Sequence, residues 1–443
     1  MSHGHQRAAA AATRLGPRQW GRLLAWCSFD WANSSYPTVV VTFVFAAYFT
    51  TAVADTPEIG TAQWGHALAL SGLAVAILAP ILGAIADQGG RRKPWIGAFT
   101  IIAIASGAAL WWIEPGPAYA LAALVLVAVG NAAFEFGQVF YNAMLPDVAP
   151  PERLGRISGW AWSAGYTGGL VCLAVSLVLF AQPVPPLFGL DAAAAEQVRI
   201  IGPFVAVWFA VFALPLFLVV PDAPPHRQPM GESLRRGLSS LGRTLKSLPQ
   251  NGQIGRYLLA HMIYTDGLNT LFAFGGIYAA GTFAMSYQEI LVFGILLNIA
   301  AGLGAAAFAW VDDWIGPKRT ILIALVGLLV AGAAILVVET RLAFTLLGCV
   351  IGIFIGPAQS ASRSLMARLA PPAQRTELFG LYALSGKATA FVGPALVGAV
   401  TLWANSQRAG MATILVFFLV GLLLMLPLRE PPRIASAGSG ASP

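Results

Sequence analysis

The sequence predicts an all-α integral membrane protein with twelve transmembrane helices, arranged as two pseudo-symmetric six-helix halves. Three observations support this fold class. Hydrophobic residues make up 57% of the chain and charged residues only 10%, against about 25% charged residues in an ordinary soluble domain. Apolar stretches long enough to cross a bilayer recur along the 443 residues. Related motifs also occur in the same order in both halves of the chain.

Twelve stretches approach the roughly 20 mostly apolar residues that a spanning helix needs. Because a helix satisfies every backbone hydrogen bond internally, we expect helices rather than a barrel. The expected spans are 20–49, 65–86, 94–113, 118–146, 157–181, 200–220, 255–281, 288–311, 320–338, 343–367, 378–403 and 406–427.

Loop charge predicts the orientation. With an even number of spans, both termini and alternate loops share one side, and 22 of the 26 Lys and Arg residues fall there. Arg199, Arg341 and Arg408 fall on the other side, and Lys387 lies within a predicted span. Because positive loops favour the cytoplasm, we expect both termini to be cytoplasmic in a multi-pass protein of a cell membrane, specifically a bacterial inner membrane.

The spans divide the chain into five segments. We expect a cytoplasmic tail at 1–19, a six-helix half at 20–220, a basic linker at 221–254, a second six-helix half at 255–427 and a second tail at 428–443. The linker stretch GESLRRGLSSLGRTLKSL has two readings. It could form an amphipathic helix on anionic lipid, or act as a solvated tether between the halves.

Three motif pairs indicate an internal duplication, which is common in transporters. Each half has an Asp-x-x-Asn near its start, a tight polar loop after its second helix, and a glutamine late in its fourth helix. The offsets between partners are 236, 226 and 221 residues. The paired residues are Asp30 and Asn33 with Asp266 and Asn269, the loop from Asp87 with the loop from Asp313, and Gln138 with Gln359.

These residues carry a family resemblance. GAIADQGGRRK at 83–93 resembles the loop signature of the major facilitator superfamily. The stretches at 29–49, 141–169 and 362–394 resemble the vacuole-effluxer-like branch, also called the unknown major facilitator family. The resemblance covers residues 26–427 and implies alternating-access transport, with amino-acid efflux as in the fungal vacuolar exporters of that branch.

The resemblance also implies a gate made by the polar loops. Asp87 is expected to bind the start of the eleventh helix near residues 375–377, where the helix dipole favours a negative charge; a simple topology anchor is the alternative. The second loop departs from this signature, because Ala309 stands where the first loop has Gly83. The expected gating residues are Gly83, Asp87, Gly90, Arg91, Arg92, Asp313, Gly316 and Lys318.

Charged residues inside the predicted spans indicate a polar pathway, because an ionised group at the bilayer centre costs at least about 2.5–3.5 kcal/mol. Glu135, Gln138 and Asn142 share one helix face, and we expect Glu135 and Arg363 to line one cavity from opposite halves. Acids beside bases suit a zwitterion, and Glu135 could carry a coupling proton; pairing that only locks helices is the alternative. The candidate pathway residues are Asp30, Asn33, Glu135, Gln138, Asn142, Asp266, Asn269, Gln359, Arg363 and Lys387.

Other functional classes lack support in the sequence. There is no G-x-x-x-x-G-K-[ST] motif, no H-E-x-x-H motif and no nucleophile elbow, so we expect no ATPase, no enzyme and no cofactor. The three cysteines form neither a disulfide framework nor a metal motif, and scattered basic residues argue against nucleic acid. His66 and His261 stand alone, and Trp160, Trp162 and Tyr166 suit helix packing or a substrate site.

The sequence thus favours a secondary transporter of small polar solutes, with amino acids favoured by the family resemblance. Its expected partners are a small-molecule substrate, protons and the lipid bilayer, and we expect a monomer. The alternatives are a drug or metabolite exporter of the same fold, and a membrane scaffold or sensor that transports nothing.

Overall fold

The computed structural model describes residues 16–225, 230–248 and 252–430, and these are helical with no strand. Most of the two predicted tails, and parts of the linker, lie outside the described residues. The first half contains α2 (Pro17–Asn33), α3 (Val44–Tyr48), α4 (Pro57–Gly89), α5 (Lys93–Ala109), α6 (Ala120–Ala143), α7 (Leu145–Val148), α8 (Leu154–Ser176), α9 (Glu196–Arg199) and α10 (Ile201–Val219).

The second half follows the linker helix α11 (Met230–Ser247). It contains α12 (Gly252–Phe283), α13 (Tyr287–Ile315), α14 (Pro317–Ile335), α15 (Arg341–Leu369), α16 (Arg375–Ser385), α17 (Val392–Ala404) and α18 (Gln407–Met425). Within the described residues, ten helical segments are long and apolar enough to cross a membrane. The other two predicted spans are α12 and the α16–α17 pair, which a turn at residues 386–391 interrupts.

The first span is irregular because of Pro37. Proline lacks a backbone N–H and its ring clashes with the preceding turn of a helix. After α2, the chain therefore widens into a π-helical turn at Tyr36–Phe43, which contains Pro37. A second π-helical turn, Phe49–Val53, follows α3. Such π-turns are frequent at functional sites.

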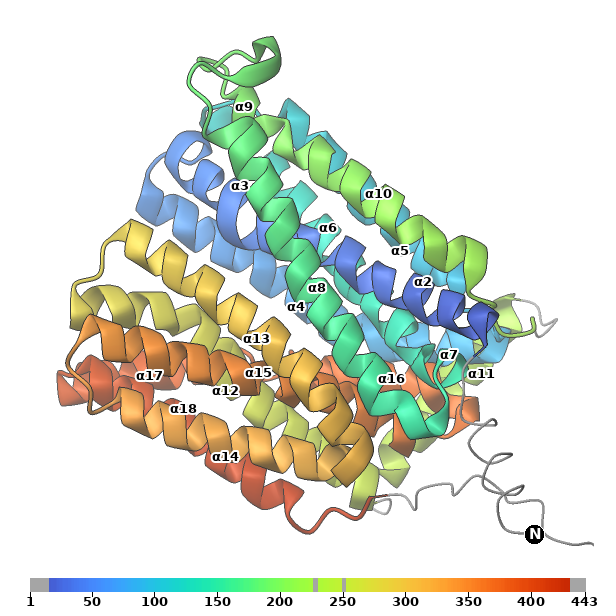
Figure 1. The fold of residues 1–443 in the computed structure, drawn as a ribbon. Helices are drawn as coiled ribbons and strands as arrows, with labels where there is room; N and C mark the ends of the chain where they lie inside the picture. Colours follow the sequence, from blue (N-terminus) through green and yellow to red (C-terminus); the bar gives the residue numbers. More distant parts are fainter. Residues whose placement is uncertain (1–15, 226–229, 249–251, 431–443) are drawn as a thin grey trace, which may run out of the picture.

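The two halves face one another along the length of the bundle, as Figure 1 shows in blue to green and in yellow to red. They meet where α4 packs on α16 and where α8 packs on α13. Small residues permit both contacts. A Cβ atom at Gly83 would collide with the backbone of Thr376, and one at Gly159 would lie 2.5 Å from the Cβ of Ala309. The structure therefore has the two closely packed helical halves that the sequence predicts.

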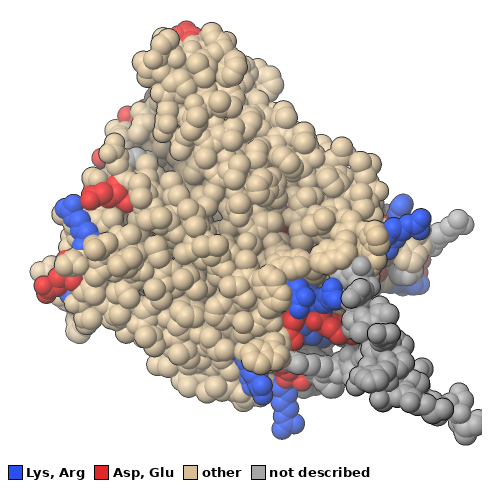
Figure 2. All heavy atoms as spheres, viewed as in Figure 1, with Lys and Arg blue, Asp and Glu red and all other residues tan. Residues whose placement is uncertain are grey.

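α2 begins and α18 ends at the same end of the bundle, which we call the termini end (Figure 1). Figure 2 shows charged side chains gathered at the two ends of the visible face, with a broad band of other residues between them. That band matches the apolar belt of a multi-pass membrane protein. At the opposite end, Arg199, Arg341 and Arg408 each donate to backbone carbonyls at or near helix C-termini.

The duplication is visible in how helices are capped at the termini end. The carboxylate of Asp222, just after α10, accepts from the backbone N–H groups of Arg92 and Lys93 at the start of α5. Glu430, after α18, accepts from the N–H of Lys318 at the start of α14. The ammonium groups also correspond, because Lys93 Nζ donates to Phe217 O and Lys318 Nζ donates to Leu426 O.

Candidate functional site

Asp87 joins the two halves at the termini end. It lies in the last turn of α4, and its two carboxylate oxygens accept from the backbone N–H groups of Thr376 (3.1 Å) and Glu377 (2.9 Å) at the start of α16. These N–H groups have no partner within their own helix, and the helix dipole adds to the attraction. We call this contact the first latch. Gly90 ends α4 with a φ of 79°, a value at which glycine has no steric penalty.

Asp313 makes the corresponding contact from the second half. Its carboxylate accepts from the backbone N–H of Arg156 near the start of α8 at 3.1 Å, and lies 3.3 Å from Nε of the same residue. This is the second latch. The loss of the leading glycine at Ala309 is compensated, because Gly159 on the facing helix supplies the missing space. Gly316 and Lys318 lie in the following turn, where Glu430 caps α14.

A buried arginine strengthens the first latch. Arg92 is 3.8 Å from Asp87, donates from Nε to Thr376 Oγ1 at 2.9 Å, and donates from Nη1 to Asp147 at 2.6 Å. Arg375 at the start of α16 binds the same Asp147 at 2.5 Å. Arg91 instead points outward and lies 3.7 Å from Asp222. The sequence does not predict a role for Asp147, because its partners Arg92 and Arg375 come from segments far apart in the chain.

A central cavity of about 350 Å³ lies between the halves. Side chains of α2, α6, α8, α12, α13, α15 and α16 line it. Eight of the ten predicted pathway residues are among them: Asp30, Glu135, Gln138, Asn142, Asn269, Gln359, Arg363 and Lys387.

Arg363 and Asp30 form a buried ion pair between the halves. Arg363 Nη1 lies 2.9 Å from Asp30 Oδ2, and the two side chains are 2% and 6% exposed. The guanidinium also donates to Ser158 and to Asn142 Oδ1. Its carbon lies 5.2–5.8 Å from the ring centres of three aromatic residues, a cation–π distance. These are Trp26, Tyr141 and Trp162.

Glu135 and Lys387 form a second ion pair between the halves, at 2.8 Å. Both side chains are partly exposed to the cavity. Lys387 lies in the turn that separates α16 from α17, so the interruption of the eleventh span brings its ammonium group to the cavity. Glu135 and Arg363 therefore line one cavity, but each pairs with another residue.

The polar amides connect neighbouring helices. Gln138 Nε2 lies 3.4 Å from Asp30 Oδ1 and 3.3 Å from Asn33 Oδ1. Asn269 donates to the carbonyl of Gly386 at 3.2 Å, next to the interrupted helix. Asn33 and Asp266 are buried but do not line the cavity. In the described chain, neither carboxylate oxygen of Asp266 has a hydrogen-bond partner.

The cavity also contains aromatic residues and a histidine that are not among the predicted pathway residues. Tyr166 donates to Gln359 Oε1 at 2.5 Å. His261 Nδ1 lies 2.7 Å from Ser385 Oγ, and its ring stacks on Tyr382 with 4.0 Å between centres. Their helical spacing suits packing equally well, so periodicity alone could not distinguish these residues. In the described residues, no three His, Cys, Asp or Glu side chains form a metal site.

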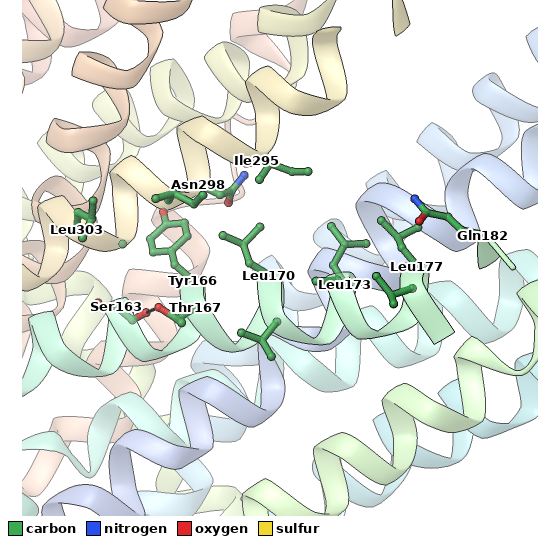
Figure 3. Close-up of a pocket in the computed structure, with 15 residues that line it drawn as sticks. Ser163, Tyr166, Thr167, Leu170, Leu173, Leu177, Gln182, Ile295, Asn298 and Leu303 are labelled. Atoms are coloured by element: carbon green, nitrogen blue, oxygen red, sulfur yellow. Dashed lines mark hydrogen bonds between the residues drawn. The ribbon is translucent and has the colours of Figure 1, made fainter. Parts of the chain in front are cut away.

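A side groove of about 530 Å³ runs between α8 and α13. Figure 3 shows Leu170 and Leu173 of α8 along it, and Leu177 just after the end of α8. Its polar end adjoins the central cavity, because Tyr166 and Asn298 line both spaces. The groove is otherwise almost entirely apolar, whereas polar side chains make up a larger share of the cavity lining.

Sequence comparisons find related proteins. The family model described as "Vacuole effluxer Atg22 like" matches residues 65–431. The chain is 27% identical over 413 residues to the uncharacterized MFS-type transporter YxiO of Bacillus subtilis, a match that covers 90% of this chain and 93% of that protein. It is 26% identical over 300 residues to autophagy-related protein 22 of Cryptococcus neoformans, with 63% of this chain and 52% of that protein covered.

Solved structures share the fold. The transporter FucP in its outward conformation superposes with a TM-score of 0.71 at 14% identity, covering 93% of this chain and 99% of FucP. The human organic anion transporter MFSD10 gives a TM-score of 0.69 at 14% identity, covering 93% of this chain and all of that chain. FucP is described as a major facilitator superfamily transporter. At 14% identity, the two structures show only that the fold is shared.

Proposed function

The chain belongs to the Atg22-like vacuole effluxer family of the major facilitator superfamily, and from this membership we propose that it exports amino acids by alternating access, coupled to protons. The family makes the chain a membrane transporter rather than an enzyme. What we propose beyond family membership is the class of substrate, the coupling of transport to protons and the direction of transport.

The proposal rests on the two ion pairs that join the halves across the central cavity. Asp30 with Arg363, and Glu135 with Lys387, each place one charge on each half. A zwitterionic amino acid carries the same two charges. Its carboxylate can replace an acid beside Arg363 or Lys387, and its ammonium group can replace a base beside Asp30 or Glu135.

This exchange of charge partners couples the binding of substrate to the conformational change. While the ion pairs are intact, they hold the halves together around the cavity. When a zwitterion takes the place of one pair, its two charges become the partners of the acid and the base, so that pair no longer joins the halves by direct contact. A proton taken up by Glu135 would release Lys387 in the same way, which is how a proton and a substrate can drive one conformational change.

The two latches define the gate at the termini end. Asp87 and Asp313 each bind a helix start in the opposite half, so opening this end requires both contacts to break. From the loop charges, we propose that this end faces the cytoplasm of a cell membrane and that the protein works as a monomer.

Transport by purified protein in vesicles tests the proposal. Vesicles preloaded with an unlabelled amino acid should accumulate the labelled one by counterflow, and a sugar such as fucose should give none. The variant Asp30→Asn/Arg363→Gln, with both charges removed, is the matched negative control. Absence of counterflow for every amino acid, with the protein folded and inserted, would refute amino-acid transport.

The side groove favours a second candidate, an exporter of apolar or amphipathic compounds. Its apolar lining meets the charged cavity at Tyr166 and Asn298, so one molecule could occupy both. Thermal stabilisation by hydrophobic cations, without stabilisation by amino acids, would favour this candidate. A scaffold or sensor would show no substrate flux at all.

A further inference from the structure

The linker helix α11 has three distinct faces. Its contact face consists of small residues that are buried against the bundle: Ser233, Gly237, Ser240 and Thr244. A Cβ atom at Gly237 would lie 3.0 Å from the backbone of Ala84 and Ile85, near the end of α4. The helix is therefore docked on the protein through a polar, closely packed surface, and the free tether considered from the sequence does not describe it.

The apolar residues of α11 lie on one flank of that contact face. Leu234, Leu238 and Leu245 are 44%, 46% and 46% exposed, and only Leu241 is buried. At about 100° per residue, these leucines form a single row roughly a quarter-turn from the contact face. An exposed leucine row on a helix attached to a membrane protein is typical of insertion into the bilayer surface.

The basic residues occupy the other flank. Arg235, Arg236, Arg243 and Lys246 are all exposed, and the one acid among them, Glu232, forms an ion pair with Arg236. The charge of this row complements an anionic membrane surface, which attracts basic side chains over a Debye length. A leucine row and a basic row on one helix together indicate a lipid surface with anionic headgroups.

α11 also touches the first latch directly. Ser240 Oγ donates to Glu377 Oε2 at 2.9 Å, and the Glu377 side chain is buried. The backbone N–H of the same Glu377 donates to Asp87 at 2.9 Å. One residue at the start of α16 is thus held both by the latch and by the linker helix.

We propose that α11 is a lipid-sensing element that lies in the leaflet at the termini end and stabilises the first latch when anionic lipid is present. The leucine row inserts among acyl chains and the basic row binds headgroup phosphates, which seats Ser240 on Glu377. Anionic lipid then favours the state closed at the termini end. The inference needs two conformational states, but it does not depend on the identity of the substrate.

The first experiment measures insertion. In a chain whose three cysteines, Cys27, Cys172 and Cys349, are replaced by alanine, a fluorophore is attached at Leu238→Cys or at its matched neighbour Ser239→Cys. Brominated acyl chains should quench the label at 238 and leave the label at 239 bright. Equal quenching at both positions, or none at 238, would overturn the proposed insertion.

The second experiment measures gating. Spin labels at Glu152→Cys and Ala373→Cys, exposed positions on opposite halves at the termini end, report the closed fraction from their separation. Addition of phosphatidylglycerol to phosphatidylcholine vesicles should raise the closed-to-open ratio about fivefold, the low end of usual coupling strengths. Neutralising the basic row with Gln should abolish this response, whereas Arg319→Gln, an exposed control at the same end, should retain it.

The third experiment tests whether Ser240 connects lipid binding by α11 to the first latch. Ser240→Ala should leave the quenching at 238 unchanged but remove the lipid response of the spin-label pair. A wild-type lipid response in Ser240→Ala, or in the Gln-substituted basic row, would overturn the proposal. None of these measurements uses a transported substrate, so failure of amino-acid counterflow and failure of lipid sensing are distinguishable.

Discussion

Arg363 shows how one residue can bind both halves of a transporter. It is buried, it carries a permanent charge, and its partners come from α2, α6 and α8 as well as from the aromatic rings that surround it. A charge in such a place is tolerated only with a counter-ion and satisfied N–H groups. Asp30 and the oxygens of Ser158 and Asn142 meet both requirements.

The buried pair predicts a non-additive response to mutation. Asp30→Asn or Arg363→Gln alone should lower stability by about 3–5 kcal/mol, because each leaves a buried charge without its partner. The double variant should be more stable than the sum of the single changes predicts. Thermal unfolding in detergent measures this, with exposed Arg319→Gln as a near-neutral control. Strict additivity would show that the two charges act independently.

Glu135 predicts a different response, because its pair with Lys387 is partly exposed to the cavity. Glu135→Gln should keep the protein folded but reduce transport about tenfold, as expected for the loss of one charge-assisted hydrogen bond. It should also flatten the dependence of transport on pH, whereas Glu135→Asp should retain part of it. Unchanged pH dependence in Glu135→Gln would assign the coupling proton to another group.

At the scale of elements, the latches join helix ends to helix starts across the two halves. Asp87→Asn should weaken the attraction to α16 by about 0.3–2 kcal/mol, which shifts the closed-to-open ratio by up to about thirtyfold. Asp313→Asn should act on α8 in the same direction, and the two effects should add because the latches share no residue. Cysteine labelling at the two cavity mouths measures the shift. A wild-type labelling ratio in both variants would leave these aspartates as topology anchors.

At the scale of the whole molecule, the even number of spans places both described chain ends at the termini end. The charge imbalance predicts that this end is cytoplasmic. A reporter fused to the C-terminus and one inserted at residues 54–56, between the first span and α4, should therefore report opposite compartments. Reports from the same side would contradict the span count, and exchanged sides would contradict the orientation.

The sequence by itself determined the membrane class, the approximate spans and the duplication, because apolar length and motif order are local properties of the chain. It also singled out Asp87, and the family resemblance supplied its partner near residues 375–377. The sequence could not show which charged residues form ion pairs with one another. The positions of Glu135 and Arg363 on the fourth helix of each half, together with the family resemblance, predicted one shared cavity, but their partners Lys387 and Asp30 lie hundreds of residues away.

Only the tertiary structure decided these pairings, since they depend on how α2, α6, α15 and the α16–α17 turn meet around a common space. Asp266 also shows what a sequence motif cannot predict. It shares the Asp-x-x-Asn motif with Asp30, yet Asp30 faces the cavity and Asp266 does not. A motif specifies which residue types are close along one helix, whereas the rotation of that helix against its neighbours determines what each side chain meets.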